Sequence, residues 1–586
     1  MRVVFNQTKD LILVVPETSK ESSWIKNFPA FTKDGMYYSF PAKINIAHNI
    51  ISRMRKSKVS LKVDKDVYDF LQTPFKLKQL PTEFKFHTNP MDYQEIALRY
   101  LYTVGSGGLL LDPGMGKSKV VLDYIKLMGF NRSIIVCPKA LLFVWEDEIA
   151  IHRPELTFHI VKTTDWEQEK SGILENQVTV LNYTKAVMFR PELKQIGAEF
   201  IHLDEFLIKD PKTDRTKALT NLSYEIPYRC GGSGTLINNT VMDVYCPTRY
   251  LQPSLVGYNY KNFFDKHVVT VMANKGTDSQ RAQIVGFRGL DEARSILESC
   301  SIVMTKEQWL KLPEKKFFDI QVQLSDEQRS AYYSLLSNYI ADIQGNLVEI
   351  EYPIVMISKL YQISQGFIYQ NPPEEDRDIS LELVGEGAKP SKVKKKPRTT
   401  IFFEQSPKIT ALRELILGKL KDRRAIIWFN MEAEYEMISS MLNEEGQSYL
   451  VVKGGEKNTG DKVRTFNNDP AIKWLVCQAK SVNYGITVLG TSLEKLETGN
   501  YEVFPNIAPE VYTQIFYSMN FSLEVYLQQQ DRIHRLGQKH TCEYYRIFAN
   551  TPVEKRIQKA IEEKMSLRWE MLVDVAKELL VNKEGE

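Results

Sequence analysis

The strongest constraint on the fold is an alternation of short apolar runs with amphipathic helical patterns, which occurs twice along the chain. From about residue 108, the runs GGLLL, RSIIVC, QVTVLNY and EFIHLDE are separated by helical patterns such as SKVVLDYIKLM and ALLFVWEDEIA. Such an alternation is typical of a buried parallel sheet with helices on both faces. It restarts near residue 408 with RAIIWF, YLVVKG, IKWLVCQA and CEYYRIF. The sequence therefore predicts an α/β fold with two such domains in series.

The chain length of 586 residues leaves room for three or four domains, at roughly 150 residues per domain. The helical stretches DEARSILESCSIVM and SDEQRSAYYSLLSNYIADIQ lie between the two α/β patterns, followed by the polar segment NPPEEDRDISLELVGEGAKPSKVKKKPRTT. That segment is typical of a flexible linker, and its basic run favours a solvated stretch or a nucleic-acid contact over a nuclear signal. The predicted domains are an N-terminal accessory domain (1–85), a first α/β domain with a helical extension (86–320), a helical insertion with a basic linker (321–404), and a second α/β domain with a C-terminal helix (405–586).

Charge and cysteine content exclude several classes of protein. The formal net charge is only +3, so a surface that binds nucleic acid would have to be local. The six cysteines are dispersed, with no CxxC pair and no His cluster, which argues against zinc and against a disulfide framework. No apolar run is long enough to cross a membrane, and Asp10 comes too early for a signal peptide. We therefore expect reduced thiols and an intracellular protein without a membrane span.

The sequence LLLDPGMGKS has the composition of a phosphate-binding loop between a strand and a helix. Gly114 and Gly116 would let backbone N–H groups surround an oxyanion, Lys117 would reach the terminal phosphates, and the Ser118 hydroxyl could ligate Mg²⁺. The strict pattern requires glycine where this chain has Leu111. A tight structural turn is therefore the alternative interpretation.

Two acids at the end of a later apolar run favour the phosphate loop over the turn. AEFIHLDE ends in Asp204 and Glu205, 87 residues after Lys117. A nucleotide hydrolase needs one carboxylate to hold Mg²⁺ and a neighbouring one to position and deprotonate the attacking water. Acids at a strand end can also be merely solvated or capping residues. The loop and the acid pair together, in this order within one α/β domain, predict nucleotide hydrolysis.

The order of motifs from Tyr93 to Arg556 resembles that of the Swi/Snf-type ATPases, the DNA-translocating branch of the superfamily-two helicases. The segments that carry the resemblance are DYQEIALRYL, IIVCPKALLFVWEDEI, LDEFLIKDPKTDRTKAL, GGSGTLINNTVMDVYCPTRYLQP, SPKITALRELI, RRAIIWFN, QAKSVNYGIT and QQQDRIHRLGQ. The resemblance implies two RecA-like P-loop domains with ATP and Mg²⁺ as cofactors.

The resemblance also implies roles for individual residues. The expected ATP-binding residues are Gln94, Gly114, Met115, Gly116, Lys117, Ser118 and Gly485, with Ser118 and Asp204 as ligands of the metal. The expected catalytic residues are Lys117, Asp204, Glu205, Arg532 and Arg535. The expected DNA-binding residues are Lys139, Ser233, Gly234, Thr235, Lys480, Asn483 and Thr487.

The stretch DRIHRLGQ contains two arginines three residues apart, Arg532 and Arg535. On a helix they would share a face, and their like charges would destabilise the helix by about 0.2–0.5 kcal/mol unless an anion lay between them. A solvated basic helix face is the alternative. The resemblance implies that the anion is the terminal phosphate of ATP, whose charge the pair would stabilise.

The chain also departs from the family pattern. Phe206 and Leu207 replace the usual Ala and His after the acid pair, and Leu236 replaces a usual Pro. QAKSVNYGIT lacks a double glycine and is similar to the annealing-helicase branch, whose members carry a basic HARP domain before the motor. Residues 1–85 resemble that domain through a turn at Asp34 and Gly35 and a helix ending in RMRKSK, although a generic accessory domain is the alternative. The segment TSLEKLETGNYEVFPNIAPE is interpreted as an insertion.

We therefore expect an ATP-driven translocase, monomeric and sequence-tolerant, on duplex, fork or junction DNA. Single-strand-binding, replication and recombination proteins are the expected partner classes, and a bacterial or bacteriophage-infected cell is the expected setting. Three alternatives remain open: an ATPase that remodels a protein–nucleic acid complex, a DNA-binding clamp without turnover, and an RNA helicase.

Overall fold

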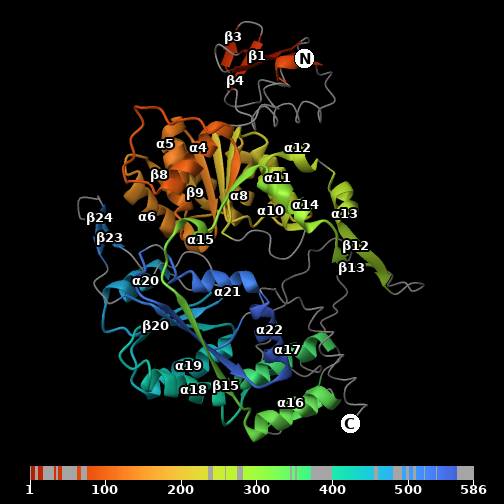
Figure 1. The fold of residues 1–586 in the computed structure, drawn as a ribbon, viewed down its shortest axis with the longest axis vertical. Helices are drawn as coiled ribbons and strands as arrows, with labels where there is room; N and C mark the ends of the chain where they lie inside the picture. The colour runs from red at the N-terminus through yellow and green to blue at the C-terminus, as the bar shows by residue number, and fades with distance from the viewer. Residues whose placement is uncertain are drawn as a thin grey trace. The chain divides into compact units, whose positions relative to one another are not determined.

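The structure is a computed structural model that describes most of the chain. The described residues are 2–6, 11–16, 32–34, 37–41, 62–67, 76–234, 242–257, 259–273, 281–338, 340–343, 346–349, 353–370, 399–454, 459–479, 491–495, 501–505, 510–519, 522–535 and 537–563. The chain divides into two compact units (Figure 1), residues 1–312 and residues 313–586, except that residues 493–504 group with the first.

The first unit is built on a seven-stranded parallel sheet in the order β14-β6-β11-β10-β7-β9-β8. Its strands are β6 (Gly107–Leu111), β7 (Ser133–Cys137), β8 (Phe158–Ile160), β9 (Val178–Asn182), β10 (Phe200–Asp204), β11 (Tyr228–Gly232) and β14 (Ser301–Met304). Its helices are α4 (Asp92–Val104), α5 (Lys117–Met128), η1 (Lys139–Leu141), α6 (Leu142–His152), α7 (Trp166–Glu175), α8 (Tyr183–Met188), α9 (Arg190–Leu193), α10 (Asp214–Ser223), α11 (Met242–Leu251), α12 (Pro253–Val256), α13 (Tyr260–His267), α14 (Leu290–Glu298) and α15 (Lys306–Trp309).

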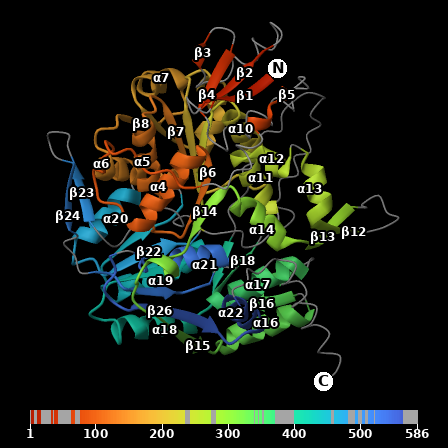
Figure 2. The same ribbon diagram turned by 45° about the horizontal axis from the view of Figure 1, so that its top comes forward.

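Alternate side chains of this sheet enter two separate hydrophobic cores, as the pleat of a strand requires. Leu109 and Leu111 of β6 pack with the core of α4, α5 and α6, whereas Leu110 packs with the core of α10, α11 and α14. Figures 1 and 2 show the two helix groups on opposite faces of the sheet. Burial on both faces explains why these strands are continuously apolar in the sequence.

The second unit repeats this design with a six-stranded parallel sheet in the order β15-β26-β25-β20-β22-β21. One core packs against α18 and α19, and the other against α16, α17 and α22. The strands are β15 (Lys315–Val322), β20 (Ala425–Phe429), β21 (Tyr449–Val452), β22 (Trp474–Gln478), β25 (Thr513–Phe516) and β26 (Cys542–Ala549). The helices are α16 (Asp326–Asn338), α17 (Pro353–Gln365), α18 (Pro407–Leu417), α19 (Glu432–Glu444), α20 (Thr459–Asn468), α21 (Leu523–Gln530) and α22 (Pro552–Glu562). The predicted fold class, two α/β domains with parallel sheets in series, is thus confirmed.

The boundary between the units falls earlier than the predicted residue 320. β15 pairs in parallel with β26 along its whole length, so residues from Pro313 onward belong to the second unit. Helices α16 and α17, which the sequence suggested were an insertion, contribute buried side chains to the core of the second sheet. The basic linker of residues 371–398 lies outside the described residues.

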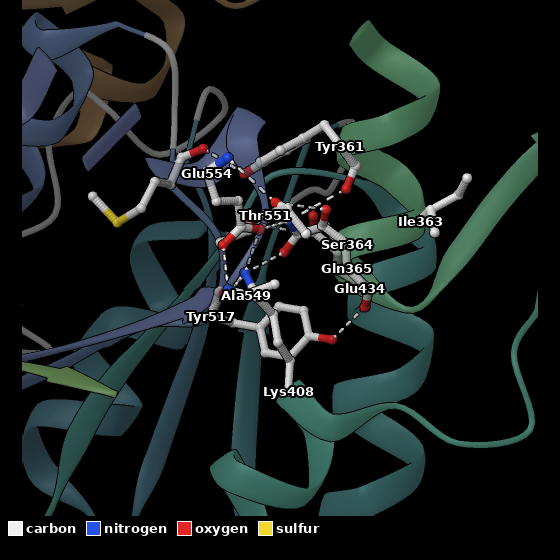
Figure 3. A network of polar contacts seen from close by, with 12 residues as sticks. Tyr361, Ile363, Ser364, Gln365, Lys408, Glu434, Tyr517, Ala549, Thr551 and Glu554 are labelled. Atoms are coloured by element: carbon white, nitrogen blue, oxygen red, sulfur yellow. Dashed lines mark hydrogen bonds and ion pairs between the residues drawn. The ribbon is translucent and has the colours of Figure 1, made fainter. Parts of the chain in front are cut away.

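A buried polar network fastens three helices of the second unit together (Figure 3). Lys408 of α18 donates hydrogen bonds to Glu554 Oε1 of α22 at 2.7 Å and to Gln365 Oε1 of α17 at 2.9 Å. Both members of the ion pair are 2% exposed. The Tyr517 hydroxyl donates to the Gln365 carbonyl at 2.7 Å, and Glu554 Oε2 accepts from the Ala549 N–H at 2.6 Å. Desolvation lowers the pKa of Lys408, so its charge depends on the neighbouring carboxylate.

The remaining strands form smaller sheets. A five-stranded sheet near the N-terminus has the order β3-β4-β2-β1-β5, from β1 (Arg2–Asn6), β2 (Leu11–Val15), β3 (Thr32–Asp34), β4 (Tyr37–Pro41) and β5 (Lys62–Val63). Strands β3 and β4 pair antiparallel, with Asp34 opposite Tyr37. Gly35 of the predicted turn and the predicted basic helix lie outside the described residues. Among the described residues there are also four two-stranded pairs: β12 (Val268–Ala273) with β13 (Arg281–Phe287), β16 (Ile340–Ile343) with β17 (Asn346–Glu349), β18 (Phe367–Gln370) with β19 (Thr399–Phe402), and β23 (Thr491–Lys495) with β24 (Tyr501–Pro505).

Two predicted helices end earlier than the sequence suggested. SIVM forms strand β14 at the edge of the first sheet, and IADI forms strand β16. All six cysteines are free and buried. Over the described ranges, no helix combines the length and apolarity needed to span a bilayer.

Candidate functional site

The segment between β6 and α5 has the geometry of a phosphate-binding loop. Gly114 and Gly116 have φ angles of 82° and 73°, in the left-handed region that favours glycine. A Cβ on Gly116 would also lie 2.3 Å from the Gln94 side-chain nitrogen. Leu111, which stands where the strict pattern has glycine, is the last residue of β6 and is fully buried. The departure therefore changes the core of the sheet, and the turn itself keeps its glycines.

Lys117 and Gln94 hold the loop from two sides. Lys117 is the first residue of α5, and its Nζ donates to the Leu111 carbonyl at 3.0 Å, across the turn. Gln94 Nε2 donates to the Met115 carbonyl at 3.2 Å, and Gln94 Oε1 accepts from the Met91 N–H at 3.0 Å. Gln94 thereby connects the start of α4 to the loop, which places two of the predicted ATP-binding residues together.

Asp204 lies at the carboxyl end of β10, on the same edge of the parallel sheet as the loop. Its Oδ2 accepts a hydrogen bond from Trp145 Nε1 at 2.9 Å, and its side chain is 8% exposed. Burial, together with the charge of Glu205, raises the pKa of Asp204 to about 7, although Lys117 and the Trp145 hydrogen bond act in the opposite direction. Because burial makes the charged form of Asp204 unfavourable, a cation bound beside it would stabilise the carboxylate.

Glu205 has a strained backbone. Its φ of 55° makes it the one non-glycine residue with positive φ in the part of the chain that the structure describes. The Tyr183 hydroxyl donates to the carbonyls of Asp204, at 3.3 Å, and of Glu205, and so holds this turn. Strain of this kind costs about 1–3 kcal/mol and is concentrated at functional sites.

The end of β11 packs directly against the phosphate loop. A Cβ on Gly232 would lie 3.3 Å from Lys117 Cδ, and a Cβ on Gly234 would lie 2.6 Å from Pro113 Cγ. Ser233 is half-buried, and its N–H donates to the Leu109 carbonyl at 3.2 Å. The predicted DNA-contacting turn therefore begins within contact distance of the phosphate loop.

Phe206, an unusual residue after the acid pair, is accommodated by a second glycine. A Cβ on Gly231 would lie 2.1 Å from Phe206 Cε1, so the ring occupies space that a side chain at 231 would need. Phe206 is buried and makes an edge contact with Tyr250. The altered box is thus matched by the neighbouring strand, and both carboxylates remain in place.

Three buried residues of the site had no predicted role: Trp145, Tyr183 and His202. Burial and the charge of Lys117 lower the pKa of His202 to about 3, so the ring is neutral, and it packs edge-on against the Trp145 indole 5.7 Å away. Trp145 belongs to a segment that carries the family resemblance, and this resemblance could have marked it as a site residue. Tyr183 follows an ordinary apolar strand, and no pattern in the sequence marks it.

The donor set of the first unit fits a nucleotide with Mg²⁺. The loop has room only for glycine at position 116, Lys117 supplies a cation, and Ser118 and the buried Asp204 supply the oxygen ligands that Mg²⁺ prefers. Ser118 is half-buried on the first turn of α5, next to the loop.

In the second unit, the structure corrects the predicted helix through DRIHRLGQ. Helix α21 ends at Gln530, and residues 531–535 form a turn. Arg532 and Arg535 are both half-buried, and Arg532 Nε donates to the Gln528 carbonyl at 2.9 Å. The two arginines therefore do not lie on one face of a helix.

The other residues of this stretch fix the turn. Ile533 is fully buried, and the His534 ring bonds through Nε2 to the Pro313 carbonyl at 2.9 Å. Gln538 Nε2 donates to the carbonyls of Val511 and Ile533 at 3.2 and 3.1 Å, and Gly537 has a φ of 97°. The stretch thus combines a frame of buried or bonded residues, Ile533, His534 and Gln538, with two half-buried arginines.

The remaining predicted residues are only partly covered by the structure. Lys139 is exposed at the start of η1, directly after β7. The others, Thr235, Lys480, Asn483, Gly485 and Thr487, lie outside the described residues.

The parallel sheet, the glycine loop at the start of a helix, and the buried acid at a neighbouring strand end define the class of P-loop nucleotide-binding proteins. The chain belongs to the SNF2-related family, because the sequence model described as "SNF2-related domain" matches residues 45–365, more than half of the chain. The resemblance to Swi/Snf-type proteins is thereby confirmed, and the annealing-helicase branch stays a prediction.

Individual relatives are distant. An uncharacterized ATP-dependent helicase of Mycoplasma genitalium is 23% identical over 86% of this chain and 45% of its own length. The TATA-binding protein-associated factor mot1 of Schizosaccharomyces pombe is 23% identical over 79% of this chain and 25% of its own length. The SWI2/SNF2 ATPase core of Sulfolobus solfataricus, solved in complex with double-stranded DNA, is 19% identical, with a TM-score of 0.37 and coverage of 85% of this chain and 95% of that one. The chain spans less than half the length of the curated relatives named here.

Proposed function

We propose that the protein is an ATP-driven motor that moves along double-stranded or branched DNA. The single observation that carries the proposal is the grouping of the phosphate loop, the buried Asp204 and the strained Glu205 at one edge of a parallel sheet, in a chain of the SNF2-related family. A binding module would not need to maintain a buried acid at this cost.

Each residue of the site has a chemical task in this proposal. The backbone of the loop and Lys117 would bind the phosphates, and Gln94 would connect the base side of the site to the loop. Asp204 and Ser118 would hold Mg²⁺, which neutralises charge on the phosphates when bound. Glu205 would orient the attacking water and accept its proton. Arg532 and Arg535 would stabilise charge on the transferred phosphoryl group, a task that rests on the family resemblance.

DNA contact is proposed to be mainly electrostatic. Lys139, exposed at the carboxyl end of β7, and the turn that begins at Ser233 and Gly234 are the described candidates. Contacts to phosphates carry no sequence information, and they release counterions. The proposal therefore requires that DNA affinity falls steeply with salt and hardly changes with sequence.

Phosphate release measured with no nucleic acid and with single-stranded, duplex, fork, four-way-junction and RNA activators tests the proposal. We expect duplex or branched DNA to stimulate hydrolysis and RNA to have little effect. Lys117→Ala should bind DNA but lose hydrolysis, whereas Lys126→Ala, an exposed lysine on the same helix, should behave like the wild type. Equal rates with and without DNA in the wild type would refute the motor.

A second candidate is an ATPase that remodels a protein–nucleic acid complex, which the similarity to a TATA-binding protein-associated factor favours. It predicts weak stimulation by naked DNA and a partner that stays bound during purification. Displacement of a protein roadblock, compared with displacement of a third DNA strand, distinguishes the two. Loss of the roadblock without loss of the third strand favours the second candidate.

A further inference from the structure

Trp309 is a large apolar side chain that remains in contact with water. It is the last residue of α15, and 40% of it is exposed. An exposed indole offers a ligand a large flat apolar surface. The position of Trp309 in the first unit indicates which ligand its ring could contact.

Helix α15 is fastened to the residue that leads into the phosphate loop. Strand β14 pairs in parallel with β6, so both strands end at the same edge of the sheet. The Asp112 N–H donates to the Met304 carbonyl at 3.2 Å, and the Lys306 N–H donates to Asp112 Oδ2 at 2.7 Å. Trp309 therefore lies one helical turn from a direct contact with the residue before Pro113 and Gly114.

The Trp309 ring also lies beside the glutamine end of the loop. Its centroid is 6.1 Å from that of Tyr93, at an interplanar angle of 54°. Tyr93 is 2% exposed and precedes Gln94, whose amide is bonded to the Met115 carbonyl of the loop. Met91, whose N–H is bonded to the same glutamine, is 43% exposed. An indole, a thioether and a primary amide are thus grouped around the start of α4.

We propose that Trp309 is the platform on which the purine base of ATP stacks. This inference rests on the proposed function, because it assigns the base end of the same nucleotide site. A purine presents a flat π-face that stacks on an indole whatever its hydrogen-bonding edge, and the neighbouring amide has both a donor and an acceptor for that edge. Tyr93, which is buried and in tilted contact with the indole, would keep the platform in place.

A comparison of ATP with inorganic tripolyphosphate isolates the base, because the second ligand has the phosphates alone. Binding to the wild type, Trp309→Ala, Trp309→Phe and Met188→Ala would be measured by titration calorimetry with Mg²⁺. Met188 is a matched control, because it is an apolar residue of the first unit that is 47% exposed. Stacking on an aromatic side chain corresponds to roughly a 5- to 150-fold change in affinity per base.

We expect Trp309→Ala to weaken ATP by a factor in that range and to leave tripolyphosphate unchanged. Trp309→Phe should retain most of the ATP affinity, and Met188→Ala all of it. Equal ATP affinity in the wild type and Trp309→Ala, or an equal loss for both ligands, would overturn the platform while leaving the phosphate site intact. A wild type that binds neither ligand would overturn the proposed function as well.

Discussion

Replacing Asp204 with asparagine should make the first unit more stable at neutral and alkaline pH, while abolishing its function. The folded protein raises the pKa of this carboxyl from 3.8 to about 7, chiefly because the group is buried. At about 1.4 kcal/mol per pH unit, the rise corresponds to about 4 kcal/mol. An asparagine oxygen can still accept the Trp145 hydrogen bond, so the variant removes the charge and keeps the contact.

The sign of the pH dependence follows from the raised pKa. The stability that a raised carboxyl contributes is fully present below its unfolded value of 3.8, and it is lost as the pH rises through about 7. The wild type should therefore lose stability relative to Asp204→Asn by about 3 kcal/mol between about pH 5 and about pH 8. Water that reaches the buried carboxylate would reduce this loss.

Urea unfolding without metal or nucleotide measures this difference, with hydrogen exchange of the β10 peptide reporting on the first unit alone. Asp214→Asn, which changes an exposed carboxylate in the same unit, is the control and should change the free energy of unfolding only slightly. Parallel pH curves for the wild type and Asp204→Asn would refute the reasoning. Addition of Mg²⁺ and ATP should stabilise the wild type and not the variant.

Three further predictions test the positioning and the frame of the site. Tyr183→Phe removes the hydroxyl that holds the Glu205 turn. Phosphate release should show kcat falling by about tenfold, with little change in the KM for ATP. An unchanged kcat would contradict this role. Lys408→Met leaves the Glu554 carboxylate buried without its cation and should cost about 3–5 kcal/mol in urea unfolding of the second unit, and adding Glu554→Gln should recover part of the loss. Arg532→Ala should bind ATP normally and lose about a thousandfold in turnover, whereas normal turnover would leave the residue without a catalytic task.

The sequence predicted the sheets well because burial on both faces imposes a pattern that is easy to detect. Continuous apolar strands separated by amphipathic helices leave few architectures open, and the two cores on either side of each sheet account for that pattern. The errors occur where a strand is short and follows a helix without a break, as at SIVM and IADI. At these places the helical periodicity of the sequence continues into residues that are extended in the structure, because they pair with a neighbouring strand. Only tertiary contacts decide between helix and strand there.

The residues of the candidate site were easier to predict than their geometry, and DRIHRLGQ shows why. Neither proline nor glycine interrupts QQQDRIHR, so local propensity continues helix α21 through both arginines. The helix nevertheless ends at Gln530, because Ile533 enters the core and Gln538 takes up the backbone carbonyls of Ile533 and Val511. These contacts join residues that are far apart in the chain or that lie beyond the last helical turn, and no periodicity encodes them. Ile533 and Gln538 lie within a few residues of the two arginines and fix the backbone that carries them. A substitution of either residue should therefore lower turnover as the loss of an arginine does, without removing any positive charge.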